Sequence, residues 1–273
     1  AGRLDGLPAD RTAGEAPTAG EEAAPRGARL DVSRLVVAEP EGSRAVLRSV
    51  GFSVGPGETV VVAGPSGAGK SMLARSLAGA EPAKSGEVRL DRIDIAALDA
   101  GALAERVGWL PQDATLFAGS VLDNVTRFGR LSAEEAFAAA RTYGLAGLIE
   151  RLPRGVHTEV GQGGRALPPG ARQAVGLWRA LAGRRRLVVL DQPSAQMDAE
   201  GEVAVLNALR RRKAEGVTAV VISHKPVIAT LADRIMVLGD GTIEVFEERA
   251  TVLDAMRRQS LRPVGERTAE VSA

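Results

Sequence analysis

At 273 residues the chain is long enough to bury one good-sized core, as one domain with a tail or as two small domains. Lysine and arginine number 35 against 34 aspartates and glutamates, and this balance disfavours binding to nucleic acid or another polyanion, apart from nucleotide phosphates. The sequence contains no cysteine, which excludes disulfides, thiolate metal sites and cysteine nucleophiles, and only His157 and His224 could provide imidazole ligands.

The first 28 residues differ in composition from the rest of the chain. They are rich in Ala, Gly, Pro, Glu and Arg without sustained periodicity, which is typical of a linker or tail. No window of the sequence reaches the roughly 18 uninterrupted apolar residues that a membrane-spanning helix needs. We therefore expect residues 1–28 to connect, and the folded domain to begin near residue 29.

Strand patterns follow this linker. Residues 34–37 and 46–54 predict strands of a half-exposed antiparallel sheet. Residues 59–63 predict a buried strand and residues 72–77 a helix. Between these two elements lie eight residues: Gly64, Pro65, Ser66, Gly67, Ala68, Gly69, Lys70 and Ser71.

This segment fits the pattern G-x-x-x-x-G-K-[ST], in which glycines let backbone N–H groups wrap a phosphate at a helix N-terminus. Lys70 would hold the β- and γ-phosphates, and Ser71 would ligate Mg²⁺. The alternative is a glycine-rich turn that happens to end in Lys-Ser. The strand before it and the helix after it favour phosphate binding.

Strands and helices alternate in the rest of the chain. Residues 86–90 and 106–110 predict strands separated by a helix over 95–105, and residues 131–152 predict a helical insert. The second half predicts helix 172–181, strand 187–190, helix 200–213, strand 218–222, a hairpin of 234–238 with 242–246, and a closing helix to about residue 258. Because several strands are wholly apolar, we expect a mostly parallel sheet covered on both faces. Residues 259–273 are polar and predict a flexible tail.

One carboxylate stands at the end of a buried strand. Asp191 closes the run 187–191, and in proteins with a phosphate loop an Asp at such a place holds Mg²⁺, directly or through water. The alternative is a strand-end Asp that caps the following turn. Its distance downstream of the phosphate loop favours the metal role.

Several motifs occur together in a recognisable order. After the phosphate loop come Leu110-Pro111-Gln112-Asp113, Leu190-Asp191-Gln192-Pro193 and Ile222-Ser223-His224. Together with the phosphate loop, these segments resemble, in order, the Walker A, Q-loop, Walker B and switch-histidine motifs of ABC transporter ATPase domains. The order and spacing of the motifs agree with that family from about Leu30 to Arg258. Residues 158–164 are similar to a motif of exporters, and residues 110–125 and 198–202 most resemble type I secretion exporters.

The resemblance implies an architecture and a cellular setting. The fold would be an α/β P-loop NTPase with a mostly parallel core sheet, an antiparallel β subdomain and an α-helical subdomain, over residues 29–258. The domain would bind ATP and Mg²⁺, pair with a second ABC ATPase domain, and drive protein export at the cytoplasmic face of the bacterial inner membrane. In that subfamily a transmembrane domain precedes the ATPase, so residues 1–28 would be its end plus a linker.

The resemblance also implies roles for single residues. Gln112 would sense Mg²⁺ and the γ-phosphate where the membrane domain docks, or else be a surface glutamine. His224 would contact the γ-phosphate and the attacking water, or else be structural. Asp198 would belong to the loop exchanged between two ATPase domains.

Three departures from the family pattern stand out. The residue after Asp191 is Gln192 where the family has a glutamate, and an amide cannot accept a proton, so general-base help of typically 10²–10⁴-fold should be lost. The dimer-contact signature, LSGGQ in the family, reads Leu167-Pro168-Pro169-Gly170-Ala171, in which the prolines offer neither a hydroxyl nor an N–H. The stretch 38–41 lacks the aromatic that would stack on adenine, which weakens base affinity and selectivity.

The departures affect turnover more than binding. In this family ATP lies between one subunit's phosphate loop and the other's signature. A homodimer would carry both defects in each site, and an intact partner would leave one defect in each. We therefore expect nucleotide binding with weak hydrolysis. The rival interpretations are a non-hydrolysing regulatory or scaffold module, and a soluble ABC ATPase of repair or translation, which the exporter-like stretch 158–164 disfavours.

Overall fold

The computed structural model describes residues 27–39 and 44–260. The expected linker 1–28 lies outside the described residues except for Gly27 and Ala28, and so does the expected tail from residue 261 onward. Among the described residues, no helix is long and apolar enough to cross a membrane.

The larger sheet has six strands in the order β10-β9-β3-β8-β7-β6. They are β3 (Thr59–Ala63), β6 (Val107–Leu110), β7 (Leu187–Asp191), β8 (Thr218–Ile222), β9 (Arg234–Gly239) and β10 (Thr242–Glu248). All neighbours pair in parallel except β10, which returns antiparallel to β9 through a tight turn. Because the strands are parallel, the segments that follow β3, β7 and β8 emerge at one edge of the sheet.

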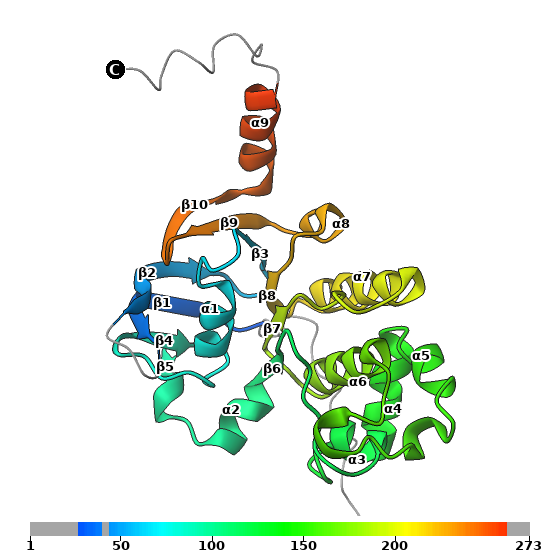
Figure 1. Cartoon of the computed structure of the whole chain (residues 1–273). Helices are drawn as coiled ribbons and strands as arrows, with labels where there is room; N and C mark the ends of the chain where they lie inside the picture. The colour runs from blue at the N-terminus through cyan, green and yellow to red at the C-terminus, as the bar shows by residue number, and fades with distance from the viewer. Residues whose placement is uncertain (1–26, 40–43, 261–273) are drawn as a thin grey trace, which may run out of the picture.

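The central strands bury both faces, as their apolar sequences predict. Within β7, Val188 and Leu190 pack into one core while Leu187 and Val189 pack into another. Successive side chains of a strand point to opposite faces, so each strand contributes to both cores. Figure 1 shows helices α3, α4, α5 and α6 to one side of this sheet and strands β1, β2 and β4 to the other.

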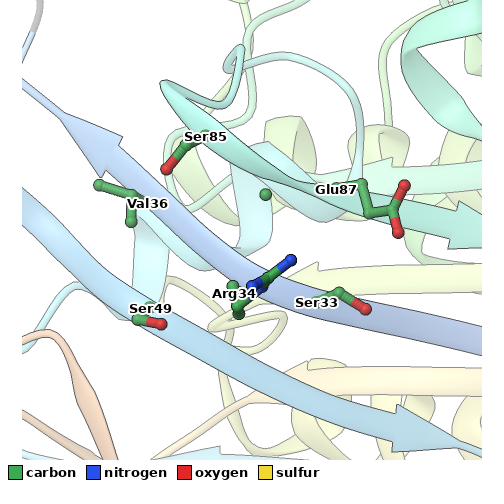
Figure 2. A pocket seen from close by; sticks show the side chains of 7 residues that line it. Ser33, Arg34, Val36, Ser49, Ser85 and Glu87 are labelled. Carbon is green, nitrogen blue, oxygen red and sulfur yellow. The ribbon is translucent and has the colours of Figure 1, made fainter.

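The smaller sheet is antiparallel, with the order β2-β1-β4-β5. Its strands are β1 (Leu30–Ala38), β2 (Ala45–Val54), β4 (Ser85–Leu90) and β5 (Ile93–Asp94). Arg34 and Ser49 adopt left-handed backbone conformations, with φ of 46° and 55°, where the register of β1 shifts. These bulges border a shallow cavity of about 540 Å³, and Figure 2 shows the polar side chains around it, carried by β1, β2 and β4.

The helical segment packs on α6 (Pro169–Leu181). It contains α3 (Val121–Thr126), α4 (Ala133–Thr142), α5 (Ala146–Glu150) and the 3₁₀ turns η2 (Gly155–His157) and η3 (Gln162–Gly164). Ser120 and Ser132 each begin a helix with a reciprocal capping box, to Asp123 and Glu135. The buried Trp178 indole donates to the carbonyl of Ala136 at 2.8 Å, which fixes α4 on α6.

The remaining helices are α1 (Lys70–Leu77), η1 (Ile95–Ala97), α2 (Ala100–Arg106), α7 (Ala199–Ala214), α8 (Pro226–Ala229) and α9 (Arg249–Ser260). The helix expected over 95–105 is divided in two. Asp94 accepts from the N–H of Ala96, and Asp99 accepts from the N–H groups of Gly101 and Ala102, so two separate helix starts occur. The predicted α/β class, with a mostly parallel sheet, an antiparallel sheet and a helical part, is confirmed.

Candidate functional site

The phosphate loop joins β3 to α1 and depends on glycine at its two ends. Gly64 has a φ of 140°, and a Cβ there would lie 2.1 Å from the carbonyl oxygen of Leu238. Gly69 caps α1 with a φ of 97°, and a Cβ there would lie 2.9 Å from Leu47. The loop is therefore pressed between β9 and β2, and a side chain at either end would displace it.

The turn between β9 and β10 supports the loop from outside. The N–H of Gly241 donates to the carbonyl of Ala68 at 3.1 Å, and the carbonyl of Gly241 accepts from the N–H of Arg48 at 2.8 Å. These bonds join three segments that are far apart in the sequence. The sequence pattern identified the loop but gave no sign of this support, because backbone hydrogen bonds between distant segments leave no periodic signal.

Lys70 lies inside the loop that precedes it. Its side chain is buried, and its ammonium donates to the carbonyls of Gly64 at 2.8 Å and Pro65 at 2.6 Å. Burial lowers the pKa of Lys70, and the charge of Asp191 opposes this effect. The lysine is thus held at the loop centre, where an anion would meet a partly desolvated cation.

Asp191 ends β7 beside the first turn of α1. It is 2% exposed; burial raises its pKa, and a hydrogen bond from the Ser71 hydroxyl together with the charge of Lys70 acts in the opposite direction. Its Oδ1 atom is buried and has no partner in the part of the chain that the structure describes. A buried carboxylate oxygen next to a hydroxyl suits Mg²⁺, which prefers oxygen ligands and commonly takes one or two carboxylates together with substrate phosphates.

A cavity of about 1020 Å³ brings Ser71, Gln112 and Asp191 together. Gln112 is exposed and follows β6, the strand next to β7. The cavity also extends along α2 to Phe117, Phe128 and Arg179. The three residues expected to bind the metal therefore share one solvent-accessible space.

Gln192 and His224 follow neighbouring strands at the same edge of the sheet. Gln192 has a φ of 48°, and its N–H donates to the carbonyl of Ile222 at 2.9 Å. His224 is exposed one residue beyond the buried Ser223. The amide of Gln173, which is 1% exposed on α6, donates to the carbonyl of Gln192 at 3.3 Å. Gln173 was missed from the sequence, although a polar residue on the buried face of an apolar helix could have drawn attention to it.

The signature segment and Asp198 lie apart from this cavity, since none of their residues lines it. Leu167 is buried, Pro168 and Pro169 are exposed where α6 begins, Gly170 approaches the carbonyl of Gln196, and Ala171 is half-buried. Asp198 caps α7 by accepting from the N–H of Gly201 at 2.8 Å. The close approach of Gly170 to Gln196 places the signature segment beside the loop that leads to Asp198.

Two other expected segments can be placed. The exporter-like stretch runs beside α3, where the carbonyl of Thr158 accepts from Val121 at 3.0 Å and the N–H of Val160 donates to Gly119 at 2.9 Å. In the stretch expected to carry an aromatic, the N–H of Glu39 donates to the carbonyl of Arg44 at 3.2 Å. Pro40 and Glu41 lie outside the described residues.

Comparison with known proteins gives consistent matches. The profile of the family described as ABC transporter matches residues 47–195. The chain is 42% identical over 231 residues to the type I secretion system ATP-binding protein PrsD of Rhizobium meliloti, covering 84% of this chain and 40% of that protein. It is 37% identical to the cyclolysin secretion/processing ATP-binding protein CyaB of Bordetella pertussis, covering 77% of this chain and 29% of that protein.

A solved structure gives the same result in three dimensions. The structure of a bacterial Atm1-family ABC exporter with ATP bound superposes with a TM-score of 0.75 at 30% identity, covering 87% of this chain and 43% of that chain. The chain thus spans less than half the length of these relatives. The family profile matches more than half of the sequence, and a relative over most of this chain is 42% identical, so the chain belongs to the ABC transporter family.

Proposed function

We propose that this chain binds Mg²⁺-ATP in the phosphate loop and acts as the ATPase domain of a type I secretion exporter. The observation that carries the proposal is the arrangement under the loop, where the unpartnered Oδ1 of Asp191 and the Ser71 hydroxyl share a cavity with Gln112. Lys70 would bind the β- and γ-phosphates in place of the loop carbonyls. A bound Mg²⁺ would neutralise phosphate charge, held by Ser71, Asp191 and Gln112.

The residues around the γ-phosphate favour binding over turnover. Gln192 can orient an attacking water through its amide but cannot take its proton, since an amide is not a base at neutral pH. His224, exposed at the same sheet edge, would hydrogen bond to the γ-phosphate and to this water. ATP hydrolysis is therefore weak in this proposal.

A second ABC ATPase domain, identical or different, would complete each site. Its contact with this chain would run through the exposed Pro168 and Pro169 of the signature segment and the exposed Asp198, which lie on neighbouring segments. Pro168 has no hydroxyl, and neither Pro168 nor Pro169 has an N–H, so this contact offers the partner's γ-phosphate fewer hydrogen bonds than a serine and glycine would. Weak turnover thus has two independent causes in one chain.

The far end of the cavity is proposed to receive the membrane-embedded part of the exporter. Phe117 is 65% exposed and Phe128 is 56% exposed, with their rings edge to face at 6.1 Å. Contiguous exposed apolar surface of this kind marks interaction sites. In this arrangement residues 29–258 form the ATPase domain at the cytoplasmic face of the bacterial inner membrane, and residues 1–28 lead to it from a transmembrane domain.

A second candidate function is a nucleotide-binding module that regulates or supports a partner without hydrolysis. Gln192 and Pro168 favour it, because each removes a group used in turnover rather than in binding. The two candidates agree on the binding site and differ only in whether ATP is consumed.

Mg²⁺-ATP binding and steady-state hydrolysis would be measured on the parent chain, Lys70→Ala and Gln192→Glu. We expect binding that depends on Lys70, turnover close to background in the parent, and turnover that rises at least about tenfold in Gln192→Glu as a general base is restored. Tight binding with no turnover in either the parent or Gln192→Glu would favour the regulatory module. Brisk turnover in the parent would overturn the assignment of Gln192, and absence of Lys70-dependent binding would overturn the nucleotide site.

A further inference from the structure

The ammonium of Lys225, the residue after His224, joins three separate segments. It forms an ion pair with the carboxylate of Glu202 in α7. It also donates to the carbonyl of Ser194, two residues beyond Gln192, at 3.3 Å. The backbone N–H of Lys225 donates to the hydroxyl of the buried Ser223 at 3.1 Å. His224 therefore lies between two anchored residues while its own side chain remains exposed.

Glu202 connects this lysine to the loop that carries Asp198. The N–H of Glu202 donates to the carbonyl of Asp198 at 2.9 Å, which closes the first turn of α7. The Asp198 carboxylate caps the same turn through Gly201. The Lys225–Glu202 ion pair thus ties the segment that carries His224 to the first turn of α7, the helix that Asp198 caps.

The Lys225–Glu202 pair is poorly placed to stabilise the fold as a whole. The two side chains are 35% and 40% exposed, and ion pairs at such exposure contribute little to folding stability. Their effect is local, because they restrict the backbone on one side of His224. We therefore expect the Lys225–Glu202 ion pair to affect the position of His224 more than the stability of the whole fold.

We propose that Lys225 and Glu202 are positioning residues, which hold His224 in place to contact the terminal phosphate of a bound nucleoside triphosphate. The inference rests on the proposed function, since it requires a nucleotide in the phosphate loop. Lys225 acts through His224 and does not itself touch the nucleotide.

The test is the ratio of ATP affinity to ADP affinity, because only ATP carries the γ-phosphate. Both dissociation constants would be measured in Mg²⁺ by competition with a fluorescent nucleotide. We expect Lys225→Met and Glu202→Gln to lower the ratio about threefold to tenfold, part of the effect of removing a hydrogen bond to a charged group, while ADP affinity stays within twofold. Lys225→Arg should restore the ratio, and Lys225→Met should add nothing to His224→Ala.

Lys213 provides a matched control. Its ammonium contacts Asp233 at 2.6 Å and the carbonyl of Leu231 at 2.7 Å, and the two charged side chains are 34% and 42% exposed. Asp233 accepts from the N–H of Thr59, at the opposite end of β3 from the phosphate loop. Lys213→Met should therefore leave the ratio unchanged.

The outcomes separate this inference from the function on which it rests. A Lys225→Met protein with the ratio of the parent, or with ATP and ADP affinities lowered equally, overturns the positioning role. If Lys70→Ala abolishes binding but His224→Ala leaves the ratio unchanged, the nucleotide site is supported and the positioning role is overturned. Binding that survives Lys70→Ala overturns the proposed function and this inference together.

Discussion

Replacing Asp191 with asparagine should stabilise the fold and weaken metal-dependent binding at the same time. The carboxylate is 2% exposed, burial raises its pKa, and its Oδ1 lacks a partner among the described residues. A buried polar atom without a partner costs about 1–3 kcal/mol. Asparagine keeps the oxygen that accepts from Ser71 and removes the charge, but its amide also needs a partner. We therefore expect a gain near 1 kcal/mol, or about 2–4 °C in Tm for a domain of this size.

With Mg²⁺-ATP bound, the parent should instead melt at a higher temperature than the asparagine variant. A ligand at about 100 times its Kd stabilises the fold by about 2.7 kcal/mol, and the variant lacks the carboxylate that would hold the metal. Thermal melts of both proteins, with and without Mg²⁺-ATP, measure the two effects directly. The reasoning is refuted if the variant melts below the parent without nucleotide, or if both proteins gain equally from Mg²⁺-ATP.

The stability difference should also depend on pH. Because the folded-state pKa of Asp191 is raised, the fold favours the protonated carboxyl. The destabilisation of the fold by the ionised Asp191 therefore grows as the pH rises from about 3.9, the pKa of an aspartate in the unfolded chain, to the pKa of Asp191 in the folded state. Above the folded-state pKa the destabilisation is constant. The advantage of the asparagine variant should be full above the folded-state pKa of Asp191 and shrink on acidification below it. An advantage that is unchanged down to about pH 4 would contradict the assignment.

Two further substitutions test the packing around the site. Gly64→Ala should abolish nucleotide binding, because its Cβ would lie 2.1 Å from the Leu238 oxygen. In Gly67→Ala the new Cβ meets open space, so this variant bears only backbone strain of about 1–3 kcal/mol. Equal losses of binding in the two variants would refute this reasoning. Trp178→Phe removes the donor to the buried carbonyl of Ala136 and should lower the free energy of unfolding by about 1–3 kcal/mol in urea titrations; an unchanged midpoint would show that this bond does not hold α4 on α6.

The elements that could be predicted from the sequence are those with local or periodic signals. The glycine loop is a local pattern, and the apolar runs of β7 and β8 predicted strands covered on both faces, as the two cores confirm. Short helices were missed because four to six residues make fewer than two helical turns and carry too little helical periodicity. Examples are α8 (Pro226–Ala229) and α3 (Val121–Thr126), although the latter has a capping box in its sequence.

The candidate site was predictable in its residues more than in its supports. Ser71, Gln112 and Asp191 were expected to act together, and the structure places them around one cavity. The contact of Gly241 with Ala68 and the contact of Lys225 with Glu202 were not foreseen. Such contacts depend on how distant segments meet, which no pattern within either segment encodes.

The order of strands in the larger sheet has a consequence for synthesis of the protein. The phosphate loop precedes β8, β9 and Gly241 in the chain, yet β3 is flanked by β8 and β9, and the loop is braced by Gly241. Residues up to Gly241 must therefore leave the ribosome before this loop can close, because its neighbours β8 and β9 and the bracing turn all follow it in the chain. We expect ATP to give a nascent chain no protection from proteolysis until the segment that includes Gly241 has emerged. Nucleotide binding then acts as a check on completed folding rather than as a guide to its early steps.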